Sequence, residues 1–132
     1  MTQPCGIDTS VLVRLAVGEP ELDFERCVAA LRTLVEDHGR EVFASNQVIG
    51  EAYVAIQHHY RVSDTDARAA LINVLTSGLV APLNGQSVIL ALRSKGQPGL
   101  FDRLIADDYS RVGLQTLTLD RRMASLPGAQ RL

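Results

Sequence analysis

The sequence has few of the residues that mark several common protein classes. It contains two cysteines, no tryptophan, three phenylalanines and three tyrosines among 132 residues. Cys5 and Cys27 cannot build a disulfide scaffold and lack the spacing of a zinc finger. The scarcity of aromatic residues disfavours a platform on which single-stranded bases stack. We interpret Cys27 as a small buried side chain of a protein from a reducing compartment.

Long apolar runs and a surplus of one charge are also absent. No stretch approaches the roughly 20 apolar residues that span a bilayer. Residues 1–6 have neither the basic start nor the apolar run of a signal peptide. The 13 basic and 15 acidic residues give a net charge of −2, so contact with a polyanion requires a local basic patch. We therefore expect a cytoplasmic protein without a membrane segment.

The pattern that is present is typical of one α/β domain formed by residues 1–132. Hydrophobic residues make up 46% of the chain, and its length suits a single core. Short apolar segments alternate with helical patterns, which predicts a mainly parallel sheet. We expect strands at 5–8, 41–44, 79–83 and 114–119, helices at 9–16, 21–38, 86–95 and 100–112, and two further helices that begin near Ser45 and Ser63.

Four carboxylates stand out by their position. Asp8 closes the first expected strand and Asp120 closes the last, so in a parallel sheet both would face the crevice beyond the carboxyl ends. Asp102 lies in the first turn of a helix, and Glu51 lies at the edge of an apolar helical stripe. Taken singly, each has an ordinary explanation as a cap, a helix-dipole partner, a turn residue or a surface ion pair. Meeting in one crevice, they would repel each other, and a divalent cation such as Mg²⁺ would relieve that repulsion.

The histidines do not offer a zinc site instead. His58 and His59 are adjacent, so they project about 100° apart on a helix. His38 stands alone near the end of a helix. We interpret all three as ordinary surface residues.

The four acids lie in motifs that resemble those of a known family. The motifs are residues 7–12 (IDTSVL), 45–51 (SNQVIGE), 101–106 (FDRLIA) and 117–122 (LTLDRR). In this order they resemble a PIN domain, most closely the VapC-type toxin ribonucleases of toxin–antitoxin modules. The resemblance covers the chain from residue 7 to about residue 123. It implies a PIN-like α/β/α sandwich with a mainly parallel central sheet.

The resemblance also implies an activity, namely metal-dependent endoribonuclease action in which an activated water hydrolyses RNA phosphodiester bonds. Asp8, Glu51, Asp102 and Asp120 would form the acidic site. Asp8, Asp102 and Asp120 would hold Mg²⁺ or Mn²⁺, while Glu51 would bind a second ion or orient the water. Ser10 and Thr118 would support this site. The family's toxins form homodimers, and a cognate antitoxin protein holds them inactive.

Substrate affinity would come from arginines beside the acidic motifs, because guanidinium groups grip phosphates in a bidentate manner. The candidates are Arg14, Arg103, Arg121 and Arg122. One departure from the family is the pair Asp107 and Asp108, which stand where small residues are usual. Either one of them replaces or supplements Asp102, or both lie on a solvated helix face. Asp108 falls on the apolar stripe of its helix, so it is either partnered or turned outward.

Two other functions fit the sequence less well. The first is a PIN-fold interaction or RNA-binding protein whose catalysis is weak or lost. The second is a phosphoryl-transfer domain with an aspartyl nucleophile at the end of a strand. A dehalogenase-type phosphatase needs a second aspartate where Ser10 stands, and a receiver domain needs a lysine late in the chain. The only lysine, Lys95, precedes the last expected strand.

Overall fold

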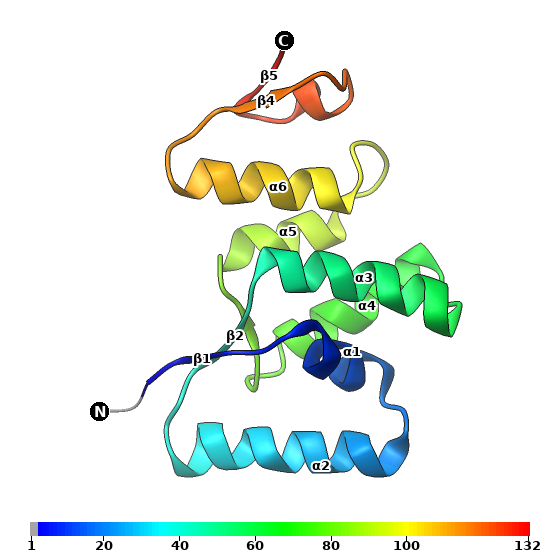
Figure 1. Ribbon diagram of the computed structural model, residues 1–132, viewed down its shortest axis with the longest axis vertical. Helices are drawn as coiled ribbons and strands as arrows, with labels where there is room; N and C mark the ends of the chain where they lie inside the picture. The colour runs from blue at the N-terminus through cyan, green and yellow to red at the C-terminus, as the bar shows by residue number, and fades with distance from the viewer. Residues whose placement is uncertain (1–2) are drawn as a thin grey trace. The chain divides into compact units, whose positions relative to one another are not determined.

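A computed structural model describes residues 3–132, and the chain in it forms two compact units (Figure 1). The first unit ends at Leu83, and the second runs from Asn84 to Leu132. Met1 and Thr2, which begin the segment interpreted as lacking a signal peptide, lie outside the described residues. Each unit is described separately below.

The first unit is a three-stranded parallel sheet with helices. The sheet has the order β1-β2-β3, with Cys5 opposite Val42 and Phe43 opposite Ala81. Because the strands are parallel, their carboxyl ends meet at one edge of the sheet. Its elements are β1 (Cys5–Gly6), α1 (Thr9–Val17), α2 (Glu21–Arg32), the π-helix η1 (Thr33–Asp37), β2 (Val42–Ala44), α3 (Asn46–Tyr60), α4 (Asp64–Leu75) and β3 (Ala81–Pro82).

Local chemistry explains where the helices of this unit begin. Asp8, Ser45 and Ser63 have extended backbones, and their side chains accept hydrogen bonds from the backbone N–H groups three residues later. These bonds satisfy N–H groups that the helix itself leaves without a partner. The first helix then stops at Gly18, which adopts a left-handed conformation with φ 75°.

Packing in the first unit centres on α1, which contacts α2, α3 and α4. Leu12 of α1 is fully buried, as are Ile49 of α3 and Leu71 of α4. Burying a leucine or isoleucine side chain contributes about 1.5–3 kcal/mol. The buried apolar side chains are Leu12, Leu31, Val42, Ala44, Ile49, Ala52, Ile56, Ala67, Leu71, Leu75 and Val80.

The second unit contains two helices and a two-stranded parallel sheet. Its elements are α5 (Gln86–Arg93), α6 (Leu100–Arg111), β4 (Thr116–Thr118), the 3₁₀ helix η2 (Met123–Ser125) and β5 (Ala129–Arg131). β4 pairs with β5 in a register that sets Thr116 opposite Ala129. Helices α5 and α6 pack on each other. The buried apolar side chains are Val88, Ile89, Ala91, Leu92, Leu100, Leu104 and Met123.

The boundary between the units is held on both sides by hydrogen bonds. The Leu83 N–H donates to the carbonyl of Ala44 at 2.8 Å, within the first unit. The Asn84 carbonyl accepts from Arg111 at 2.9 Å, within the second. The next residue, Gly85, has φ 82° and ψ −150°, a region open essentially to glycine alone.

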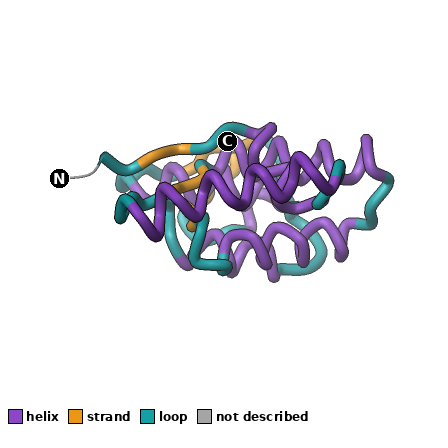
Figure 2. Tube along the Cα trace, turned by 90° about the horizontal axis from the view of Figure 1, so that it is seen from below, coloured by secondary structure: helices purple, strands orange, loops and turns teal. Residues whose placement is uncertain are grey.

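The prediction of an α/β fold with parallel strands is confirmed, although the strands lie in two separate sheets. The PIN-like sandwich and the single domain remain predictions. Figure 2 shows that helices dominate the chain and that the strands are short. The first strand ends at Gly6, two residues before Asp8, and η1 interrupts the expected helix 21–38. The short strand β5 was not predicted.

The described residues also bear on the expectation that the chain has no membrane segment. Within residues 3–132, no helix combines the length and the apolar character that a bilayer crossing requires.

Candidate functional site

Asp8 lies just beyond the carboxyl end of β1, where its carboxylate caps α1. Its Oδ1 accepts hydrogen bonds from the Ser10 hydroxyl at 2.6 Å and from the Val11 N–H at 3.2 Å. These two bonds lower the pKa of Asp8 below its usual value of 3.8, because hydrogen bonds to a carboxylate favour its charged form. The side chain is exposed. Asp8 is therefore an ionised, solvent-accessible carboxylate at the carboxyl edge of the sheet.

Glu51 lies in the second turn of α3, and the fold brings it to the residue that follows Asp8. The Thr9 hydroxyl donates a hydrogen bond to Glu51 Oε1 at 2.8 Å, across 42 positions of sequence. Because β1 and β2 are parallel neighbours, α1 and α3 both start at the same edge of the sheet. The first unit thus brings together two exposed acids, here called the Asp8–Glu51 pair, with the hydroxyls of Thr9 and Ser10.

Asp120 in the second unit has a more local set of partners. Its Oδ1 accepts from the N–H groups of Arg122 at 2.7 Å and Met123 at 3.4 Å, in the turn that leads into η2. Its own N–H donates to the Thr118 hydroxyl at 2.9 Å. The Thr118 hydroxyl and the Asp120 carboxylate therefore both stabilise the turn between β4 and η2.

Asp102 is half-buried in the first turn of α6, where the helix dipole favours a negative charge. Its neighbour Arg103 donates to the Pro98 carbonyl at 2.9 Å. This bond fixes the Arg103 side chain to the loop that precedes α6.

The four arginines predicted to bind RNA differ in whether their side chains already bond to other residues. Arg14 forms a salt bridge with Asp23 at 3.2 Å and donates to the Glu19 carbonyl. Arg121 and Arg122 are exposed beside Asp120. The last two therefore have the more accessible guanidinium groups.

Asp107 and Asp108 share a partner in the second unit. The Asn84 amide donates to Asp107 at 2.9 Å and to Asp108 at 2.8 Å. Asp108 is thus partnered and also exposed, so both alternatives given for it hold.

Within each unit of the described chain, no group of three or more histidine, cysteine, aspartate or glutamate side chains lies close enough to hold a metal ion. In the first unit, the Ser10 hydroxyl donates to Asp8 and the adjacent Thr9 hydroxyl donates to Glu51. In the second unit, the Asp120 N–H donates to the Thr118 hydroxyl. The meeting of all four acids stays a prediction.

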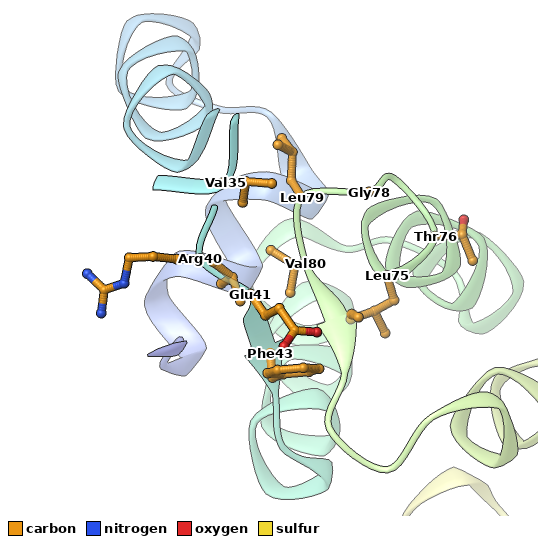
Figure 3. Close-up of a pocket in the computed structure, with 11 residues that line it drawn as sticks. Val35, Arg40, Glu41, Phe43, Leu75, Thr76, Gly78, Leu79 and Val80 are labelled. Atoms are coloured by element: carbon orange, nitrogen blue, oxygen red, sulfur yellow. The ribbon is translucent and has the colours of Figure 1, made fainter. Parts of the chain in front are cut away.

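The first unit also has a hollow of about 340 Å³ at the opposite ends of the strands from Asp8. Residues at the start of β2 and β3 line it, and most of its lining is apolar. In Figure 3 the Arg40 side chain extends away from it, and this side chain donates to the Gln3 carbonyl at 2.9 Å. The other polar side chains of its lining are Glu41 and Thr76, and the Thr76 hydroxyl donates to the Ile72 carbonyl at 2.7 Å, which leaves Glu41 as the one acid there without a second acid beside it in the lining. We therefore regard the Asp8–Glu51 pair as the candidate site.

Thr9 is the residue of this site whose role the sequence did not reveal. Asp8 caps α1, as one of its ordinary explanations allows, and the Thr9 hydroxyl instead donates to Glu51. A signal was present, because Thr9 lies between two residues of the acidic motif. Its partner could not be inferred from local pattern, since Glu51 is distant in sequence.

Comparisons with known proteins do not add a family to this geometry. No protein-family model matches the chain, and neither the curated proteins nor the solved structures include a match. The resemblance to PIN domains therefore stays a prediction.

Proposed function

We propose that the chain is a Mg²⁺-dependent endoribonuclease of the PIN-domain, VapC-like type, the toxin of a toxin–antitoxin pair. One observation carries the proposal. An ionised, exposed aspartate lies at the carboxyl edge of a parallel sheet, and a second acid, in the second turn of α3, accepts a hydrogen bond from the very next residue. Ligand sites of α/β folds occur at this edge.

The donor atoms of the pair suit Mg²⁺ or Mn²⁺. Both side chains are carboxylates, flanked by two hydroxyls, and hard divalent cations prefer oxygen ligands. Proteins commonly bind Mg²⁺ through one or two carboxylates, with water and substrate phosphate completing the shell. The Asp8–Glu51 pair supplies two carboxylates, which is the number that such a site commonly uses. The proposal adds Asp102 and Asp120 as further acids of the same site.

The chain's own residues would divide the work as follows. Ser10 and the Val11 N–H hold the Asp8 carboxylate in its charged form, ready to bind a cation. Thr9 holds Glu51, whose carboxylate accepts a hydrogen bond from the attacking water and so orients it. A bound Mg²⁺ supplies a more acidic water and neutralises charge on the phosphate oxygens. Arg121 and Arg122 provide phosphate contacts.

The biological setting is part of the same proposal. A homodimer, inhibition by a cognate antitoxin and a cytoplasmic location follow from the resemblance to VapC-type toxins. An antitoxin encoded beside this protein, able to suppress the RNA cleavage, would support the setting.

A second candidate is an RNA-binding or interaction protein that has lost catalysis. One observation favours it, since Oδ1 of Asp8 and of Asp120 each bonds to backbone N–H groups of its own turn. Structural capping alone accounts for an aspartate at both positions.

The variant Asp8→Asn separates the two candidates. Asparagine caps helices about as well as aspartate, so the fold should be retained. We expect Mg²⁺-dependent cleavage of a single-stranded RNA to fall on the order of 100-fold or more, because the charged ligand is gone. The matched control is Asp37→Asn, which removes an exposed carboxylate from η1. Unchanged cleavage by Asp8→Asn, or full cleavage in EDTA, would overturn the proposal.

A wild-type protein that binds RNA but does not cleave it with Mg²⁺ or Mn²⁺ would establish the second candidate instead.

A further inference from the structure

A groove of about 260 Å³ lies between α1 and α3 in the first unit. Both helices contact each other along their length, and Figure 1 shows α1 beneath α3. Thr9, Ser10, Val13 and Arg14 line the groove from α1, and Ala55, His59 and Tyr60 line it from α3. Its volume is just under the roughly 300–1,000 Å³ of pockets for drug-sized ligands, so it suits one small organic group.

The groove begins at the candidate site. Thr9 and Ser10 line it, and the same two hydroxyls donate to Glu51 and Asp8. An α-helix rises about 1.5 Å per residue, so Tyr60 lies about 13 Å along α3 from Glu51. A chain-like ligand held at the acids therefore continues along this groove toward the end of α3.

The charges along the groove favour an anionic ligand. Its lining includes two basic residues, Arg14 and His59, and no acid. Arg14 is already bonded to Asp23, whereas His59 is exposed at the end of α3. The His59 imidazole therefore offers an anion a hydrogen bond from α3, and the N–H groups of Arg14 beyond Nη1 offer further ones from α1.

Tyr60 adds an aromatic surface at the far end of the groove. Its side chain is 42% exposed, and it also lines a neighbouring hollow of about 330 Å³ together with Ile56 and Val62. An exposed ring beside a groove is the feature on which bases of single-stranded RNA stack, with a gain of about 1–3 kcal/mol per base.

We propose that the α1–α3 groove binds one nucleotide beside the scissile phosphate of a single-stranded RNA. Tyr60 stacks on a base, and His59 donates a hydrogen bond to a phosphate oxygen. This inference rests on the proposed ribonuclease function and adds a substrate-binding surface to it. It also revises the interpretation of His59 as an ordinary surface residue.

Binding measured without catalysis tests the inference. A fluorescein-labelled single-stranded oligoribonucleotide is titrated with the full chain in EDTA, and its anisotropy reports the Kd. Tyr60→Ala should weaken binding by about 5- to 150-fold, which corresponds to the loss of one stacked base. Tyr60→Phe should bind like wild type, and Tyr60→Leu, which keeps apolar bulk, should bind like Tyr60→Ala.

Matched controls come from the same chain. Tyr109 of α6 is 44% exposed and does not line the groove, so Tyr109→Ala removes a similarly exposed ring that the proposal does not use. His58 neighbours His59 on α3 and does not line the groove. We expect His59→Gln to weaken binding by about tenfold and His58→Gln to leave it unchanged. In cleavage with Mg²⁺, Tyr60→Ala should raise KM and preserve kcat.

The outcomes distinguish the groove from the function on which it rests. If wild type cleaves RNA but Tyr60→Ala or Tyr60→Leu binds as tightly as wild type, the proposed RNA binding by the groove is contradicted and the proposed ribonuclease function is not. If Tyr109→Ala weakens binding as much as Tyr60→Ala, the groove is likewise overturned. If wild type neither binds nor cleaves RNA, both proposals fall.

Discussion

The two units begin their helices with different residues. In the first unit, Asp8, Ser45 and Ser63 cap α1, α3 and α4 with side-chain oxygens. In the second unit, α5 and α6 begin after Gly85 and Gly99, which have no side chain to offer. The first unit therefore fixes most of its helix starts by local chemistry. The second leaves both of its starts to water and to packing.

The second unit also exposes more large apolar side chains than the first unit does. Among the described residues, β4 in the second unit buries Thr116 but leaves Leu117 exposed, and Leu119 just after the strand is exposed as well. Contiguous exposed apolar surface is uncommon on monomeric soluble proteins. The first unit therefore buries a larger share of its large apolar side chains than the second unit does. The large exposed apolar residues are Leu22, Val54, Tyr60 and Leu83 in the first unit, and Leu90, Phe101, Ile105, Tyr109, Val112, Leu114, Leu117, Leu119 and Leu132 in the second.

Truncating one leucine in each unit is the strongest test of this comparison. Leu71 of α4 is fully buried, whereas Leu119 after β4 is 78% exposed. We expect Leu71→Ala to lower the free energy of unfolding by about 2–5 kcal/mol, because it leaves a cavity. Leu119→Ala should change it by less than about 0.5 kcal/mol. Urea denaturation followed by circular dichroism measures both, and equal losses would contradict the difference between the units.

Removing a cap from the first unit should have a smaller effect. The Ser63 hydroxyl accepts from the Asp66 N–H at 3.1 Å at the start of α4. Ser63→Ala should cost about 1 kcal/mol of unfolding free energy, because that N–H group loses its partner. Thermal denaturation reports the change, with Ser87→Ala in the first turn of α5 as a control. A loss no greater than that of the control would show that the cap contributes nothing.

Adding a cap to the second unit should have the smallest effect, with the opposite sign. Gly99 precedes α6 with φ −71° and ψ 179°, a conformation that any residue adopts, and a Cβ there would meet no atom within 4 Å. Gly99→Ser should raise the free energy of unfolding by a few tenths of a kcal/mol, since serine caps slightly better than glycine. A chemical-denaturation midpoint that moves down instead would show that α6 gains nothing from a cap.

Much of the fold could be predicted where the signal is local. The helices from Ser45, Ser63 and Leu100 begin as expected, because capping and turn residues act within a few positions. The strand β5 could not be predicted. Its sequence Ala129–Arg131 has no strand pattern of its own, and it is a strand because the register with β4 gives its backbone partners.

The candidate site also contains features that could be predicted from local sequence and features that could not. The position of Asp8 beyond the first strand could be predicted from its motif. The contact of Thr9 with Glu51 could not, because tertiary packing of α1 on α3 makes it. The partner of Asp108 was foreseen only as an alternative, since Asn84 lies 24 positions away. The acids and the local partner Ser10 could therefore be predicted, whereas the contacts with distant residues could not.

The tightly held boundary at Leu83 and Asn84 has a practical consequence for anyone who engineers this protein. A junction between two compact parts is the usual place to splice in a reporter or to open a new chain terminus. Here both flanking residues carry backbone bonds, and Gly85 takes a shape that other amino acids resist. The exposed stretch at 95–97 is the better place for an insertion.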